Sequence, residues 1–231
     1  MSTAEALQTV TDALRKRLEG SRTMGAPTIV HTGPPDKMRA GLETAPFLNL
    51  FLFEVLPNPA WRNQEVPARG GARLRPPLPL DLRYLLTAYP TANDDGPAHG
   101  LLGQAMLRFH DQPVVSRAEL TAAMPVVGTR TGVDQQFELV RVGLMHLPLD
   151  ELSKLWTAFG TQYRLSVVYQ VSVVLIDPTT PPDAPLPVLQ RGSTDPTVGG
   201  SSAVGSVLQR GSTGSGASGG VVGSIKTTET W

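Results

Sequence analysis

The sequence predicts an α+β domain followed by an extended arm. Residues 1–177 give, in order, a helix, three strands, two helices, a strand, a helix and a long strand. This irregular order favours a mixed or antiparallel sheet with helices packed against it over a doubly wound parallel sheet. Residues 178–231 are rich in Gly, Ser, Thr and Pro, the composition of a linker. We therefore expect a folded domain at residues 1–177 and a low-complexity C-terminal arm at residues 178–231.

The first predicted element is a helix near the N-terminus. Ser2 and Glu5 have the spacing of a capping box, and Gly20 is a typical residue at a helix end. Residues 28–31 then predict a short strand, which a Gly-Pro-Pro sequence beginning at Gly33 interrupts. The helix has one apolar stripe: Leu7, Val10, Leu14 and Leu18.

Two longer strands follow. Residues 47–55 are apolar on both alternating faces except at Asn49 and Glu54, so we expect an interior strand. Residues 80–88 alternate between an apolar and a more polar face, which predicts a strand with one buried side. The predicted buried side carries Leu80, Leu82, Tyr84, Leu86 and Ala88.

Two helices come next. Residues 93–100 have turn composition and lead into a predicted helix at residues 101–112, before Pro113. Ser116 and Glu119 form a second capping box, so a short helix should begin there and stop before Pro125. The apolar face of the first of these helices comprises Leu101, Leu102, Ala105, Met106 and Phe109.

The domain should end with a strand, a helix and a long strand. Residues 137–144 alternate as a strand, and residues 149–159 form a helix that Gly160 ends. We expect Trp156 to lie in the core because it shares a helical face with other apolar residues. Residues 163–176 give the strongest strand pattern in the chain.

Composition excludes several classes of function. The chain has no Cys, so disulfides and thiolate metal sites are excluded. Its 20 basic and 20 acidic residues balance, so it lacks the broad basic surface of a nucleic-acid-binding protein. The N-terminus has no signal-peptide pattern, and the longest apolar stretches, at residues 47–56 and 167–176, are too short to span a bilayer. We expect a soluble protein made in the cytoplasm.

Catalytic and metal motifs are weak. Residues 216–220 match a nucleophile elbow around Ser218, and Gly214, Gly216 and Gly219 have dinucleotide-binding spacing. Both matches lie in a Gly/Ser tract without the strand and helix that these motifs need, so we expect no enzyme and no cofactor. A metal site at Asp94, Asp95 and His99 is the alternative to a turn and helix cap, and we favour the cap.

Three features outside the predicted core could contact partners. The loop after residue 61 is basic, and its arginines either bind a carboxylate-bearing partner or are merely solvated. Trp231 either docks into another subunit or is a cloning remnant. The sequence VLQRGST occurs at residues 188–194 and 207–213, either as two docking segments or as a duplication in a spacer. The loop arginines are Arg62, Arg69, Arg73 and Arg75.

Three blocks of the sequence resemble one known family. They are NPAWRNQEVP with PLPLDLRYLLTAYP, HGLLGQAMLRFHDQPVVSRAEL, and LPLDELSKLWTAFGTQYRLSVVYQVSVVLID. Together they resemble the N-terminal domain of the cap, or tail-terminator, proteins of extracellular contractile injection systems, which are phage-tail-like particles of the antifeeding-prophage type. The resemblance covers roughly residues 3–177 and implies a non-enzymatic protein. Such a protein forms a sixfold ring on the end of the inner tube and sheath, ending polymerisation and fixing particle length.

The resemblance implies partners as well as a fold. They are further copies of the chain and the sheath and tube subunits of a particle that is assembled in the cytoplasm and then either released or retained. We expect residues 221–231 to add a strand to, or stack on, a neighbouring cap or sheath subunit. Their contact residues would be Val221, Val222, Ile225, Lys226 and Trp231. The alternative function is a binding adaptor that tethers a membrane or cargo partner to the particle.

Overall fold

The structure is a computed structural model that describes residues 5–20, 22–23, 26–39, 42–61, 76–91, 94–124 and 132–178. The helices are α1 (Ala6–Glu19), α2 (Gly96–Asp111), α3 (Arg117–Ala123) and α4 (Leu149–Ala158), with 3-10 turns at Pro35–Lys37 and Val133–Gln135. The strands are β1 (Arg22–Thr23), β2 (Ala26–Pro27), β3 (Ile29–His31), β4 (Phe47–Pro57), β5 (Leu78–Tyr89), β6 (Val114–Val115), β7 (Val140–Met145) and β8 (Ser166–Ile176).

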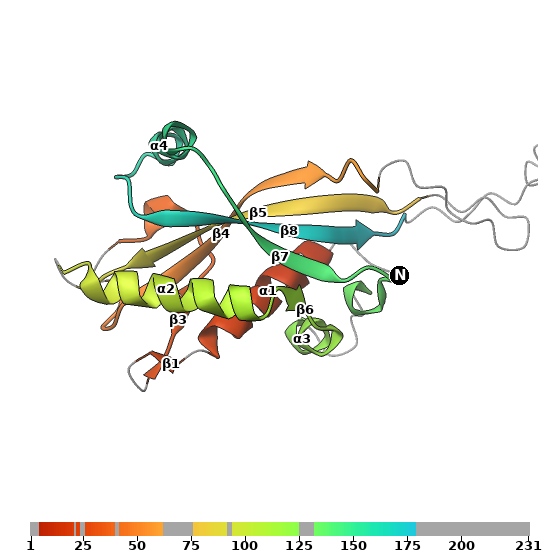
Figure 1. Cartoon of the computed structure of the whole chain (residues 1–231), viewed down its shortest axis with the longest axis horizontal. Helices are drawn as coiled ribbons and strands as arrows, with labels where there is room; N and C mark the ends of the chain where they lie inside the picture. The colour runs from red at the N-terminus through yellow and green to blue at the C-terminus, as the bar shows by residue number, and fades with distance from the viewer. Residues whose placement is uncertain are drawn as a thin grey trace, which may run out of the picture. The chain divides into compact units, whose positions relative to one another are not determined.

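The predicted α+β class with a mixed sheet is confirmed. Six strands form one sheet in the order β3-β4-β5-β8-β7-β6, and β1 pairs with β2 separately. Strands β3 and β4 are parallel, and the other neighbouring pairs in the large sheet are antiparallel. Figure 1 shows α1, α2 and α3 on one side of this sheet and α4 on the other.

Both faces of the sheet are packed, which corrects the prediction for β5. Its predicted inward residues, including Leu82 and Leu86, lie in the larger apolar cluster with α1, α2 and α3. Leu85, on the opposite face, is also buried and packs with Leu152 and Trp156 of α4. The expectation of one buried side was therefore wrong, because α4 covers a face that the alternation of β5 marks as more polar.

Several local predictions are confirmed. The side chain of Ser116 accepts a hydrogen bond from the backbone of Glu119, whose carboxylate accepts one in return, so the capping box at α3 is formed. Helix α1 ends at Gly20 as predicted and begins at Ala6, and Ser2 lies outside the described residues. Trp156 is buried, and its indole N–H donates to the hydroxyl of Ser166 at 3.2 Å.

Three boundaries differ from the sequence predictions. Helix α2 begins at Gly96, so most of the predicted turn forms the first helical turn, which tolerates proline at its start. Strand β7 begins at Val140, leaving Phe137 outside it and 66% exposed. Strand β8 begins at Ser166 instead of residue 163, because Tyr163 belongs to the exposed connection from α4.

Candidate interaction surfaces

The contact residues predicted from the sequence lie outside the described residues. The arginines of this group are Arg62, Arg69, Arg73 and Arg75, and the arm residues are Val221, Val222, Ile225, Lys226 and Trp231. The repeated VLQRGST segments and Ser218 also lie outside the described residues. The structure does describe Trp61, the residue immediately before the basic loop, and with it the surface from which that loop departs.

Trp61 is positioned by a turn fixed to the centre of the sheet. The side-chain oxygen of Asn58 accepts hydrogen bonds from the backbone N–H groups of Ala60 and Trp61 at 3.0 and 3.1 Å. Its amide nitrogen donates to Asp81 of β5 at 2.8 Å, and Asp81 also accepts from Gln170 of β8 at 3.1 Å. The polar side of β5 thus holds the start of the basic loop.

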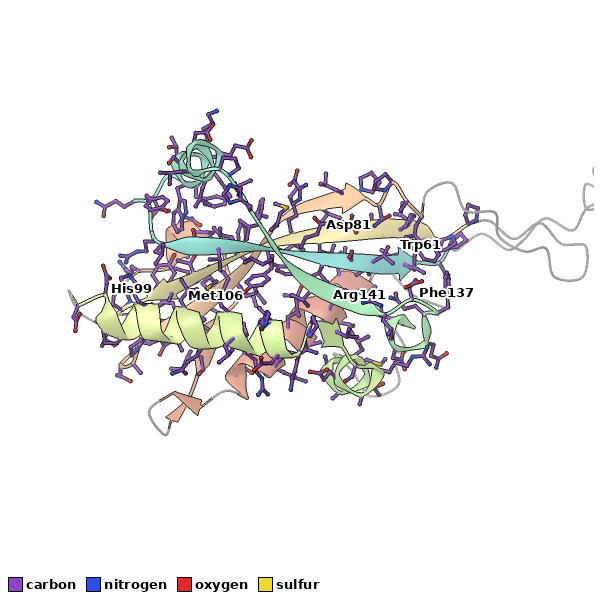
Figure 2. All side chains as sticks on the ribbon, in the orientation of Figure 1. Trp61, Asp81, His99, Met106, Phe137 and Arg141 are labelled. Atoms are coloured by element: carbon purple, nitrogen blue, oxygen red, sulfur yellow. The ribbon has the colours of Figure 1, made fainter. Side chains whose placement is uncertain are left out.

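Phe137 meets Trp61 at the end of the sheet. The two ring centroids are 5.0 Å apart, and Figure 2 shows both side chains together. The neighbouring Gln136 donates to the carbonyl of Val173 at 2.9 Å and accepts from the N–H of Leu175 at 3.2 Å. These bonds fix Gln136 to β8 and so hold in place an aromatic pair made of the exposed Phe137 and the partly buried Trp61, which we call the Trp61–Phe137 surface.

A second surface lies along β7, whose outer edge is only partly paired. Strand β6 pairs with Val140 and Arg141, and the N–H of Val142 donates to the carbonyl of Pro113 at 2.7 Å. In the described part of the chain, no strand pairs with residues 143–145 on this side. Backbone groups alternate in direction along an antiparallel strand, so the N–H and C=O of Leu144 point outward like the N–H of Val142.

An apolar groove of about 590 Å³ lies between this edge and α2. Met106 and Leu107 of α2 form one wall, Leu144 of β7 forms the other, and Phe109 and Tyr169 line the groove at 4.9 Å between ring centroids. Figure 2 labels Met106 on α2, where it packs against the sheet. Leu107 and Leu144 are 59% and 62% exposed, so this groove offers apolar surface to a partner.

A further hollow of about 380 Å³ follows the same edge and includes Arg141, Met145 and Gln170 in its lining. Residues of a strand point alternately to opposite faces, so Arg141 and Met145 lie on the face opposite to Val142 and Leu144. The edge of β7 therefore has space on both faces at the residues where its backbone is unpaired.

Beside the paired half of β7, a buried arginine of α1 binds residues of α3 and β6. The side chain of Arg17 from α1 is 1% exposed and donates to the carboxylate of Glu119 at 2.7 and 2.8 Å. It also donates to the carbonyls of Gln112 at 2.6 Å and Val114 at 2.9 Å. Burial raises the pKa of Glu119, but the hydrogen bonds from Arg17 and Ser116 outweigh it and lower the pKa to about 2. One guanidinium thus joins α1, α3, β6 and the end of α2.

Asp94 and Asp95 lie in the turn that leads into α2. The carboxylate of Asp94 accepts the N–H of Gly96 at 3.0 Å, which confirms the predicted turn, whereas Asp95 at the N-cap position makes no side-chain capping hydrogen bond. The described residues contain no cluster of three His, Cys, Asp or Glu residues able to hold a metal ion. Nor does any helix in the described ranges have the length and apolar character needed to cross a membrane.

Sequence reasoning missed the residues that form both surfaces. Alternation places Phe137 in a strand, whereas Gln136 beside it is held by side-chain hydrogen bonds that no periodicity predicts. Leu107 lies outside the predicted apolar face of α2, and this unmatched leucine was the available signal. Alternation correctly places Leu144 in a strand, but the exposure of that strand edge depends on the order of strands in the sheet.

Known proteins provide independent comparisons. No curated protein sequence matches the chain. Its structure is similar to the PVC sheath/tube terminator of an extracellular contractile injection system in the extended state, with a TM-score of 0.57 and 17% identity over 89% of this chain. It is also similar to the tube-terminating cap of the anti-feeding prophage, with a TM-score of 0.54 and 19% identity over 80% of this chain. The chain spans 67% and 60% of those two chains.

The family model for the Pvc16 N-terminal domain matches residues 5–190, which contain all the described elements. This match confirms the family resemblance found in the sequence blocks, and the two solved structures share its fold. The chain therefore belongs to the Pvc16 N-terminal domain family.

Proposed function

We propose that this protein is the structural cap of a contractile injection system, a ring on the end of the inner tube and sheath that stops their polymerisation and fixes particle length. The observation that carries the proposal is the family match over residues 5–190. The similarity in fold to a sheath/tube terminator and a tube-terminating cap supports it. In this function the chain acts by contact alone, as a non-enzymatic protein without a cofactor.

A ring of six copies is the assembly we propose. A cyclic ring needs a heterologous contact, in which one patch on each subunit meets a different patch on the next. The domain has two separate surfaces that are available for contacts with other chains, the Trp61–Phe137 surface and the β7 groove. Aromatic side chains that are held in place at the surface are typical of interface cores. The remaining partners are the sheath and tube subunits, and assembly takes place in the cytoplasm.

The sequence elements beyond the described residues have roles in this proposal. Arg62, Arg69, Arg73 and Arg75 contact carboxylates of a sheath or tube subunit, and the Trp61 turn fixes the start of their loop. Residues 178–219 act as a spacer beyond the domain at residues 1–177. Residues 221–231 bind a neighbouring subunit, where the contacts of Trp231 and the apolar residues before it offset the entropy of ordering the segment.

Removing the whole protein tests the proposed function. Particles assembled without it should have tubes and sheaths of variable length, whereas restoring the full chain should restore one length, as measured by electron microscopy. An unchanged length distribution would contradict the cap function and favour the adaptor alternative. Deleting residues 178–231 tests the arm separately, because normal assembly and length in that variant would remove the arm's role and leave the cap function standing.

A further inference from the structure

We infer that the open edge of β7 binds residues 221–231 of a second copy of the chain as an added strand. The inference rests on the proposed cap function and names the site at which the C-terminal arm links neighbouring subunits. The site consists of the outer backbone groups of residues 142–145, the α2/β7 groove and the smaller hollow on the opposite face.

The edge itself has the chemistry of strand addition. A strand that ends a sheet presents unpaired N–H and C=O groups to any extended peptide. Strand β6 and Pro113 cover this edge only as far as the N–H of Val142. The outward N–H and C=O of Leu144 lie beyond that point, and the edge from Val142 to Met145 carries no charged side chain that would oppose pairing.

The two hollows fit the side chains of such a strand. An added strand points successive side chains to opposite faces of the sheet. The α2/β7 groove lies on one face and the smaller hollow on the other, and both are lined by Val142, Gly143 and Leu144. In addition, a Cβ built on Gly103 of α2 meets no atom within 4 Å, so the α2 wall leaves room beside the edge.

The sequence of residues 221–231 matches this site. More than half of the segment is β-branched, and Val221, Ile225 and Trp231 are spaced by even numbers. In an extended strand these three side chains share one face, which suits the apolar groove, whereas Lys226 falls on the opposite face. The remainder of the arm has linker composition, which makes this segment the strongest strand-forming part of the chain after Asp177.

The proposed ring, together with an arm long enough to leave its own subunit, selects a second copy as the donor. Met145 pairs with Val168 near the start of β8, so the open edge and Ile176 lie at opposite ends of that strand. At about 3.3 Å per residue these ends are roughly 25 Å apart. The spacer of about 40 residues has a root-mean-square reach of roughly 35 Å, enough to reach this edge on the same chain or on a neighbouring subunit. Only exchange between copies gives the ring a link between subunits.

Cross-linking tests this contact directly because the chain has no cysteine. One full-length variant carries Leu144→Cys and another carries Ile225→Cys, and the two are mixed and treated with a flexible bismaleimide, which tolerates uncertainty in strand register. We expect at least ten times more linked dimer than in a control mixture in which Leu149→Cys replaces Leu144→Cys. Leu149 is 67% exposed on α4, so its thiol is equally accessible but lies across the sheet from the groove.

A matched pair of groove variants completes the test. Gly103→Leu, added to the Leu144→Cys chain, should fill the groove and reduce cross-linking at least fivefold. Gly100 lies one turn earlier in α2 and does not line the groove, and a Cβ added there also meets no atom within 4 Å. Gly100→Leu should therefore leave cross-linking unchanged. Comparable loss in both variants would overturn the inference.

Two further outcomes would also overturn the inference. One is equal dimer yield from the Leu144 and Leu149 mixtures, and the other is a link that forms only within a chain carrying both Leu144→Cys and Ile225→Cys. The cap function fails separately, through unchanged particle length when the protein is absent.

Discussion

The two halves of strand β7 differ in a way that separates stability from binding. In the first half, Val140 and Val142 are buried, and β6 and Pro113 satisfy the outer backbone groups. In the second half, Leu144 is 62% exposed and its outer edge borders an apolar groove. One strand thus contributes to the core at one end and has an exposed edge, the proposed binding site, at the other.

The difference arises from what covers each half. Arg17 binds the carbonyls of Gln112 and Val114 and the carboxylate of Glu119, so α1, α3 and β6 are fixed against the first half. The chain just before Pro113 is the end of α2, so no described strand pairs with residues 143–145 on the outer side of β7, and their strand pairing is with β8 alone. Substitutions in the first half should therefore lower stability, whereas those in the second half should affect assembly alone.

The largest expected effect is that of Arg17→Ala. This change removes the donor from two backbone carbonyls and one carboxylate and leaves a cavity, so the free energy of unfolding should fall by about 3–4 kcal/mol. Urea denaturation measures it. Lys154→Ala, which removes an exposed cation 3.6 Å from Asp150, is the control and should cost less than about 0.5 kcal/mol. Similar decreases in the free energy of unfolding for the two variants would show that Arg17 does not stabilise the packing of α1 with α3 and β6.

Glu119→Gln should cost about 1–2 kcal/mol at neutral pH because the amide cannot replace the charged acceptor of Arg17. The pKa of Glu119 is lowered from 4.5 to about 2, so its contribution to stability is present above about pH 5 and is lost as pH falls through 2. The stability difference between wild type and variant should shrink over this window in urea titrations at successive pH values. A difference that stays constant from pH 6 to 2 would contradict the ion pair.

Ser116→Ala should cost about 1 kcal/mol, because α3 loses the acceptor of its capping box. Thermal unfolding followed by circular dichroism measures the change. The matched control is Ser153→Ala, whose hydroxyl donates only to the preceding turn of α4 and should matter little. If both variants unfold at the same temperature as wild type, the capping box does not contribute to the stability of the domain.

Leu144→Ser should change the free energy of unfolding by no more than about 0.5 kcal/mol, since the side chain is already exposed. Its effect should be on assembly instead, with a several-fold lower amount of protein bound per particle in quantitative immunoblots. Val142→Ser, two residues earlier and buried, should cost about 2 kcal/mol by placing a hydroxyl in the core. A larger loss of unfolding free energy for Leu144→Ser than for Val142→Ser would contradict the division of β7 into a buried, paired half and an exposed half.

Local patterns predicted much of the fold. An apolar run located β4, alternation located β5, helical spacing located α4, and the Ser116–Glu119 spacing predicted both α3 and its capping box. The buried second face of β5 was not predicted, because it depends on where α4 packs after the sheet has formed. Periodicity describes one element at a time and carries no information on which helix covers which face.

The residues that form the two interaction surfaces were harder to predict from the sequence than the helices and strands. The partly paired edge of β7 follows from strand order, which brings together segments far apart in the chain. The Trp61–Phe137 surface similarly joins residues separated by more than a helix and two strands through the hydrogen bonds of Asn58 and Gln136. The predicted contacts in the basic loop and the C-terminal arm remain predictions, and the Asn58 turn gives the loop a fixed point of departure.

The most direct test of the central claim is cryo-electron microscopy of particles assembled with the full-length protein. The cap function predicts a ring of this domain on the tube and sheath at the end distal to the baseplate, with the fold of residues 5–178 visible in each subunit. Particles whose distal ends lack this domain, or that carry it only along the sheath or at the baseplate, would contradict the cap function.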